Sequence, residues 1–168
     1  MRNTSWGDSK SEVFEKERNK PLENDGEIYL FECESLGGLE FNIFYNFKND
    51  KLYGGGYLLD ESFPTSHEVL KGYLKIINLL KEKYNSTNEI QYNWINPSGK
   101  QLFGDDIATC ISYKMVELSW IFQNNNTYIA AMLQGTDMLS GNIVIGYFDE
   151  SERDNINNSN REIEKSKL

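Results

Sequence analysis

The chain has 168 residues, of which 39% are hydrophobic and 13% aromatic, and its 17 basic and 26 acidic side chains give a net charge of −9. This length suits one domain with a core of its own, and the apolar content excludes wholesale disorder. The acidic balance repels phosphate backbones, so nucleic-acid binding is not expected.

The cysteines and the single histidine match no metal or disulfide pattern. Cys33 falls in a predicted strand and Cys110 in a predicted short helix. Two thiols do not make a disulfide framework, so both are expected to be buried as small apolar side chains, and a single bridge between them stays open. His67 is the only histidine and no cysteine pair has zinc spacing, so no metal or cofactor is expected.

Residues 1–6 are polar and lack the basic and apolar regions of a secretory signal. No run approaches the roughly 18 apolar residues of a membrane-spanning helix. These features predict no membrane span and a cytoplasmic location, or an envelope or secreted location for a chain whose signal has been removed.

Ser9 and Glu12 have the spacing of a capping box, which predicts a helix over 10–19. Three strands are predicted after it: 28–34, 39–47 and 51–60. The second of these alternates most clearly between apolar and polar residues, with Phe44 as the exception on its polar face. The Asn-Asp pair at 49–50 suits a tight hairpin turn.

The strongest helix signal covers 66–84 and begins at Thr65 and Ser66. Its apolar residues recur three and four positions apart: Val69, Leu70, Tyr73, Leu74, Ile77, Leu80 and Tyr84. Charged and amide residues occupy the other side. The pattern predicts one buried and one solvated helix face.

The second half of the chain again combines a helix with strands. A short strand is predicted over 90–94, a turn over 96–99, and a short helix after a cap signal at Asp105 and Asp106. Three further strands are predicted: 116–123, 128–134 and 142–148. Residues 150–168 are polar and predict a disordered tail.

The order α-βββ-α-β-α-βββ predicts an α+β fold, in which an antiparallel sheet of two three-strand meanders packs against two or three helices. Residues 1–149 are expected to form this single domain. The segments Trp6-Gly7-Asp8-Ser9 and Phe103-Gly104-Asp105-Asp106 are alike, and each precedes a helix and a meander. The match suggests a duplicated unit, with pseudo-repeats at about 6–60 and 103–149 joined by the helix at 66–84.

The opening Trp6-Gly7-Asp8-Ser9-Lys10-Ser11-Glu12-Val13 resembles a Trp-Gly-x-Ser-x-x-x-Val start found in uncharacterised proteins of low-GC bacteria. The hairpin residues Lys51-Leu52-Tyr53 and the strand around Trp120 resemble the same proteins. The order of elements is similar to the helix-plus-meander units of BamE-like lipoproteins and β-lactamase-inhibitor-like domains. This resemblance implies a low-GC Gram-positive source and a binding or assembly module rather than an enzyme.

Four local patterns allow a chemical and a structural interpretation, and the structural one is favoured in each. His67 is expected at the surface or as a cap, because no nucleophile motif accompanies it. The run of glycines at 54–56 lacks phosphate-loop spacing and predicts a bulge or a close strand crossing. Asp105 and Asp106 are expected to cap a helix rather than bind a cation. Residues 149–154 lack the central glycine and closing glutamate of a calcium loop.

Five aromatic residues invite comparison with a sugar-stacking platform: Trp6, Tyr92, Trp94, Trp120 and Tyr128. Aromatic side chains are also favoured in strands because they fill a pleated surface, and packing is the preferred interpretation. Phe44, Tyr128 and Met132 are predicted on the less buried face of their strands. Together with Trp94 they are the candidate partner-binding residues.

Two classes of function are compatible with these sequence patterns. The first is a non-enzymatic protein-binding or assembly module, with an inhibitor or immunity protein as one form, that docks a basic partner on an exposed sheet face. The second is a hydrolase of a small or glycan substrate that uses paired carboxylates from Glu32, Glu34 and Glu40. A solvated sheet side is the simpler explanation of these glutamates. The sequence leaves the partner and the oligomeric state open.

Overall fold

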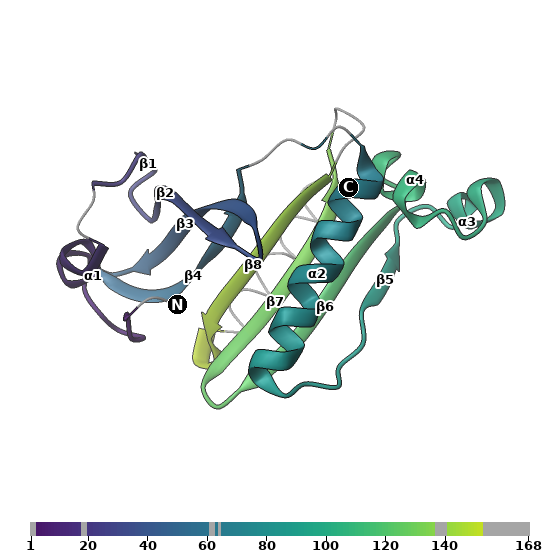
Figure 1. The fold of residues 1–168 in the computed structure, drawn as a ribbon. Helices are drawn as coiled ribbons and strands as arrows, with labels where there is room; N and C mark the ends of the chain where they lie inside the picture. Colours follow the sequence, from purple (N-terminus) through teal and green to yellow (C-terminus); the bar gives the residue numbers. More distant parts are fainter. Residues whose placement is uncertain (1–2, 18–19, 61–62, 64, 137–140, 153–168) are drawn as a thin grey trace, which may run out of the picture.

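The computed structural model describes residues 3–17, 20–60, 63, 65–136 and 141–152, without the side chains of Cys33, Glu34 and Glu152. Within these residues the chain forms one eight-stranded antiparallel sheet with helices packed against it (Figure 1). The elements in chain order are α1 (Lys10–Glu17), β1 (Glu23–Asn24), β2 (Ile28–Leu36), β3 (Leu39–Lys48), β4 (Lys51–Leu59), α2 (Ser66–Tyr84), β5 (Gln91–Trp94), α3 (Ser98–Phe103), α4 (Ile107–Ser112), β6 (Val116–Asn124), β7 (Thr127–Gly135), β8 (Gly141–Asp149) and the 3-10 helix η1 (Glu150–Glu152).

The α+β class and the antiparallel sheet expected from the sequence are confirmed. The helix at 66–84 has the predicted bounds, because Thr65 caps its first turn by accepting a hydrogen bond from the Glu68 amide, and Asn85 ends it in the left-handed conformation. The β3–β4 turn is also as predicted, since Asn49 and Asp50 both have positive φ, as a type I′ turn requires.

Three elements differ from the sequence-based expectation. The two-residue strand β1 pairs with β2 and was not predicted. The turn predicted over 96–99 leads directly into the helix α3, with Gly99 buried inside it. The first residues of the predicted tail form η1, which follows β8 without a break, and residues 153–168 lie outside the described part of the chain.

The sheet order is β1-β2-β3-β4-β8-β7-β6-β5. Strands β2 to β4 are neighbours in chain order, as are β6 to β8, and these two groups join through an antiparallel β4–β8 pair. In the middle of that pair Gly56 lies opposite Gly146. A Cβ placed on Gly56 would lie 1.9 Å from the Ile145 carbonyl oxygen. The close backbone approach at this junction therefore requires glycine.

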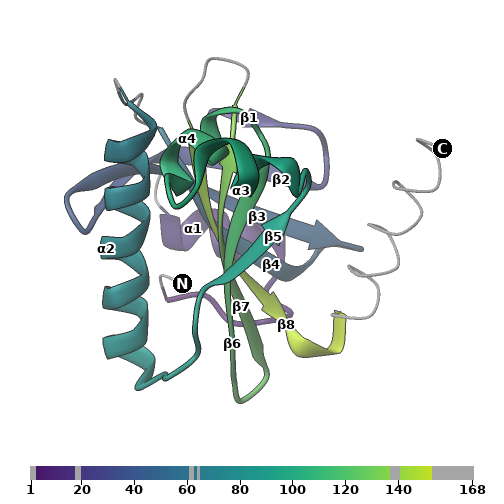
Figure 2. The ribbon, with the colours of Figure 1, turned by 90° about the vertical axis from the view of Figure 1, so that its right-hand side faces the viewer.

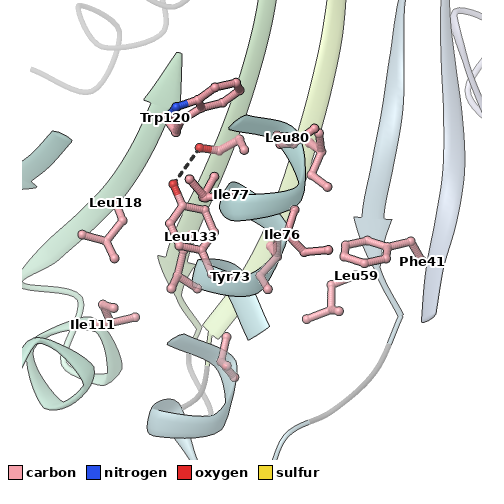
Figure 3. Close-up of a cluster of buried hydrophobic side chains, with 14 of the residues drawn as sticks. Phe41, Leu59, Tyr73, Ile76, Ile77, Leu80, Ile111, Leu118, Trp120 and Leu133 are labelled. Carbon is pink, nitrogen blue, oxygen red and sulfur yellow. Dashed lines mark hydrogen bonds between the residues drawn. The ribbon is translucent and has the colours of Figure 1, made fainter. Parts of the chain in front are cut away.

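Helices cover one face of the sheet, and the buried side chains form two clusters there. Figure 2 shows α2 standing to one side of the strands. The main cluster joins α2 and α4 to β6, β7 and β8 and includes the fully buried Trp120 (Figure 3). In this cluster the Tyr73 hydroxyl donates to the Ala131 carbonyl at 3.0 Å, which satisfies a polar group that would otherwise be costly to bury.

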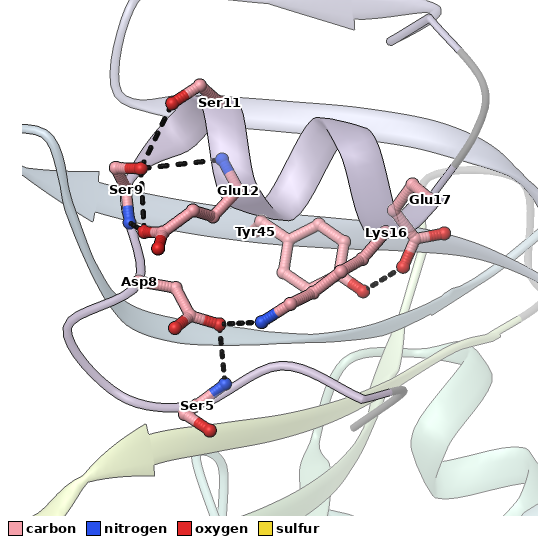
Figure 4. A network of polar contacts seen from close by, with 8 residues as sticks. All are labelled: Ser5, Asp8, Ser9, Ser11, Glu12, Lys16, Glu17 and Tyr45. Carbon is pink, nitrogen blue, oxygen red and sulfur yellow. Dashed lines mark hydrogen bonds and ion pairs between the residues drawn. The ribbon is translucent and has the colours of Figure 1, made fainter.

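The second cluster lies under α1, where Val13 packs against Phe31, Ile43, Tyr45, Phe47 and Leu52. Polar contacts hold α1 in place (Figure 4). The Ser9 amide donates to the Glu12 carboxylate at 2.8 Å, as the capping box predicts, and Lys16 pairs with Asp8 at 2.6 Å. The hydroxyl of Tyr45 donates to the buried carboxylate of Glu17. These contacts tie the N-terminal segment to β3.

We expect Gly56→Ala to lower the free energy of unfolding by about 3 kcal/mol, because the added methyl group meets backbone rather than a movable side chain. The matched control is Gly72→Ala in α2, where the nearest atom is a terminal methyl of Leu39 at 3.0 Å and alanine gains helix propensity. That control should stay within about 1 kcal/mol of the wild type. Urea unfolding measures both, and equal stability of the two variants would contradict the assigned role of the β4–β8 junction.

Candidate functional site

The face of the sheet turned away from α2, called the open face below, carries a patch of large apolar side chains. Cross-strand pairing places seven of them on it: Phe44, Leu58, Ile121, Tyr128, Met132, Val144 and Phe148. All seven are half-buried. The buried apolar residues of α1, α2 and α4 belong to the two clusters on the other face, and no described α-helix covers this apolar patch (Figure 2).

Glycines make the apolar patch flat. A Cβ on Gly54 would lie 2.7 Å from the Phe148 ring, and one on Gly146 would lie 2.6 Å from the same ring. The Phe44 ring lies over Gly56 in the same way, with its tip 2.9 Å from the Cβ position. The aromatic rings therefore lie down on the sheet rather than standing up from it. The glycine run at 54–56 serves this packing and the β4–β8 junction, which agrees with the predicted close strand crossing.

The charged positions beside the apolar patch are mainly acidic. On the β1–β3 side, Glu23 pairs with Leu30 and Glu40 pairs with Ser35. On the other side Glu117 of β6 pairs with Asn93. The exception is the β3–β4 hairpin, where Lys48 and Lys51 lie opposite each other at one end of the sheet. The open face thus has an uncharged centre with carboxylates on two flanks.

Three of the four candidate partner-binding residues belong to this patch, and Trp94 does not. Phe44, Tyr128 and Met132 lie on the open face as the alternation predicted. Trp94 pairs with the buried Val116 and packs against the main cluster on the helix-covered face. Its ring also lies 3.3 Å from the Cβ position of Gly99, in the helix that the sequence did not predict.

The five aromatic residues considered as a stacking platform do not gather in one place. Trp120 is fully buried in the main cluster. Tyr92 and Trp94 pair with core positions of β6, whereas Tyr128 lies on the open face. Trp6 lies in the segment before α1 and contacts both core clusters. Packing, the preferred interpretation from sequence, describes most of them.

His67 lies at the surface and meets an acidic neighbour that the sequence did not suggest. Its Nε2 is 3.3 Å from the Asp106 carboxylate, but the two side chains are 67% and 43% exposed. They line a cavity of about 370 Å³ between the start of α2, β5 and α4. Asp106 caps α4, as predicted, by accepting hydrogen bonds from the Thr109 amide at 3.1 Å and hydroxyl at 2.7 Å.

Cys110 does not extend this pair into a nucleophilic site. Its thiol is free and buried, and burial together with the nearby Asp106 charge raises its pKa. A raised pKa disfavours the reactive thiolate. The pKa of Asp106 is lowered, mainly by the hydrogen bonds from Thr109 and to a smaller extent by His67. The pair therefore has the character of a helix cap with a histidine beside it.

The carboxylates proposed for hydrolysis are described only in part, because the side chain of Glu34 lies outside the described residues. A register shift between Phe31 and Glu34 leaves the Glu34 backbone opposite Phe41, whereas Glu40 lies opposite Ser35. Glu32 and Glu40 are exposed. Among the described residues, no three acidic, histidine or cysteine side chains are grouped so as to hold a metal ion.

Comparisons of this chain with protein-family models, with curated proteins and with solved structures find no match. The family resemblance of the N-terminal motif therefore stays a prediction. None of the described helices is long and apolar enough to cross a membrane.

Asp106 gives a pH-dependent prediction. Its folded-state pKa lies below the ordinary value for an aspartate because of the hydrogen bonds from Thr109, so its contribution to stability is present above the unfolded pKa and is lost as the pH falls through the folded pKa. We expect the loss of unfolding free energy from about pH 5 to about pH 2 to be smaller in Asp106→Asn than in the wild type. Asparagine retains the cap near neutral pH.

The control for this measurement is Asp105→Asn, which removes the adjacent carboxylate but leaves the cap. It should keep the acid-dependent loss that comes from Asp106. Urea titrations across this pH range, monitored by circular dichroism, compare the three proteins. An identical pH profile for Asp106→Asn and the wild type would show that this carboxylate is not coupled to folding.

Proposed function

We propose that this protein is a non-enzymatic protein-binding or assembly module that docks its partner on the apolar patch of the open face. An inhibitor or immunity protein is one form of such a module. The observation that carries the proposal is the contiguous group of half-exposed apolar side chains on a sheet face that no described α-helix covers. Exposed apolar patches with a polar surround are characteristic of protein interaction sites.

The composition and shape of the apolar patch support a protein as the ligand. Phe44, Tyr128, Met132 and Phe148 are residue types enriched in the centres of protein interfaces. The rings that lie over Gly54, Gly56 and Gly146 keep the surface flat. A flat surface suits a macromolecule, whereas small ligands usually occupy concave sites.

Charge suggests the chemistry of the partner. The net charge is −9, and Glu23, Glu40 and Glu117 flank the apolar centre. The complementary surface has an apolar centre with lysines or arginines around it. Attraction of this kind acts mainly on the association rate and weakens as salt screens it.

A binding role also agrees with the chemistry found elsewhere in the described structure. The histidine–carboxylate pair of His67 and Asp106 is exposed, and the nearby Cys110 thiol is buried with a raised pKa. Nucleophilic catalysis requires the opposite arrangement, an accessible and activated nucleophile beside a base.

We infer further that residues 6–60 and 103–149 are two copies of an ancestral helix-plus-meander unit. Three observations support the duplication. Each meander ends in the strand that forms the central β4–β8 pair, and those strands run antiparallel. The alike segments Trp6–Ser9 and Phe103–Asp106 end one residue before α1 and α4 respectively. Both helices pack on the same face of the sheet. Superposition of the two halves about an axis through Gly56 and Gly146 tests this.

The docking proposal predicts that a charge in the apolar patch abolishes partner capture. Purified wild type should retain a host protein at micromolar concentration, whereas Met132→Glu and Ile121→Glu, made separately, should weaken retention about 30-fold or more, because a buried charge replaces an apolar contact. Immobilised protein, quantitative mass spectrometry of the retained proteins and titration of the recovered partner measure this.

Leu102→Glu is the matched control, because Leu102 is 68% exposed on α3, away from the open face. It should capture the same partner as the wild type. Association should also slow as the salt concentration rises. Equal retention by all four proteins, or no retained protein at micromolar concentration, would contradict docking on this face.

A further inference from the structure

A second candidate site lies apart from the apolar patch, on the helix-covered side of the sheet. It is a cavity of about 310 Å³ where the segment before α1 meets the end of α2, the β6–β7 hairpin and β8. Its lining residues come from all four of these elements: Thr4, Ser5, Trp6, Tyr84, Asn124, Thr127, Ile129 and Tyr147. This volume lies at the lower end of the range for small-molecule sites, so the cavity suits a single ring rather than an extended ligand.

The walls of this cavity are held by hydrogen bonds within the protein. The indole Nε1 of Trp6 donates to the Thr127 hydroxyl at 3.1 Å. The backbone on either side of Trp6 is fixed as well, since the Ser5 amide donates to Asp8 at 2.8 Å and the Gly7 amide donates to the Leu52 carbonyl at 2.8 Å. A preformed site loses little conformational entropy when it binds.

The lining is uncharged and rich in hydroxyl groups. Five of its eight residues carry a hydroxyl, one carries an amide, and Trp6 contributes an aromatic ring. Burial and the neighbouring Tyr84 raise the pKa of Tyr147, so its hydroxyl stays protonated. The Thr4 hydroxyl oxygen is buried and has no hydrogen-bond partner among the described residues. A buried polar atom of this kind is costly unless a bound molecule or water satisfies it.

We propose that this cavity binds one neutral pyranose sugar unit, stacked on Trp6. Hydroxyl groups both donate and accept hydrogen bonds, so a hydroxyl-rich lining matches a ligand whose own groups do both. The apolar C–H face of a pyranose ring fits an indole surface, which offers a large apolar area. The lack of a charged lining residue disfavours ionic ligands, and the net charge of −9 repels phosphorylated ones.

This sugar site is independent of the proposed docking function. It shares no residue with the apolar patch, so either can fail without the other. None of its eight lining residues is a carboxylate, whereas glycoside hydrolysis ordinarily requires a pair of them. The cavity is therefore a binding site and not a hydrolytic one.

The test titrates the full-length protein with glucose, galactose, mannose and N-acetylglucosamine, each alone, by calorimetry and by saturation-transfer NMR. Glucuronate and uridine are the comparison probes, because the first adds a charge to the pyranose and the second presents a nucleobase. We expect at least one of the four neutral sugars to bind saturably, with affinity at least about tenfold higher than that for either comparison probe.

Variants localise the binding. Trp6→Leu should weaken sugar binding about tenfold or more by removing the stacking surface. Thr4→Val keeps the shape of the side chain and removes one hydroxyl, so it should weaken sugar binding about fivefold. This variant tests the site even if Trp6→Leu does not fold. Tyr92→Leu, an aromatic residue that is 50% exposed outside the cavity, is the control and should bind like the wild type.

Three results would overturn the sugar site. The first is that none of the four sugars binds saturably up to about 50 mM, which is well beyond the millimolar range of weak specific sites. The second is sugar binding that both Thr4→Val and a folded Trp6→Leu leave unchanged. The third is tighter binding of uridine or glucuronate than of the neutral sugars. Circular dichroism of each variant establishes that it is folded before it is titrated.

Discussion

The close contact between β4 and β8 is the constraint on which the rest of the structure depends. Five residue pairs join the two halves of the sheet there, with Gly56 opposite Gly146 at the centre. Because a side chain on Gly56 would collide with the backbone of β8, the close approach at the centre of this pair requires glycine at that position. The β4–β8 junction therefore makes two small half-sheets into one sheet large enough to support α2 and the main core.

The same glycines determine the character of the open face. They leave space that the Phe44 and Phe148 rings fill from neighbouring positions, so these large aromatic residues are half-buried although no described α-helix covers the open face. Aromatic cover of strand glycines stabilises a sheet and also flattens its surface. The strand glycines and the rings that cover them thus allow the β4–β8 junction and also form the apolar surface on which we propose that the partner docks.

The N-terminal segment has a corresponding role on the helix-covered face. Trp6 contacts both core clusters and bonds to Thr127 in the distant β6–β7 hairpin. It therefore bridges the gap between the region under α1 and the region under α2. The uncharged cavity beside it lies where four chain segments meet without any one of them filling the space. Concave sites commonly form where separately packed units adjoin.

Periodicity in the sequence was enough to predict those elements whose signal is local. The helix Ser66–Tyr84 combines an apolar stripe with caps at both ends, the turn at Asn49 and Asp50 requires positive φ, and strict alternation placed Phe44 on the second face of β3. Each of these features depends on residues a few positions apart. Helix α3 was missed because its Pro97, Ser98 and Gly99 are typical turn residues, and buried packing of Gly99 against Met115 allows the helix.

Tertiary structure alone decided which distant residues meet. Alternation showed that Trp94 points to one side of its strand, but only the pairing of β5 with β6 places that side on the helix-covered face. His67 and Asp106 are 39 positions apart in the sequence, and Trp6 and Thr127 of the cavity wall are 121 positions apart. No short-range sequence pattern predicts contacts between residues so distant. By itself the sequence determined the net charge and the elements other than β1, α3 and η1, because these follow from neighbouring residues. The apolar patch and the cavity depend on strand order and register, which follow from packing of the whole chain.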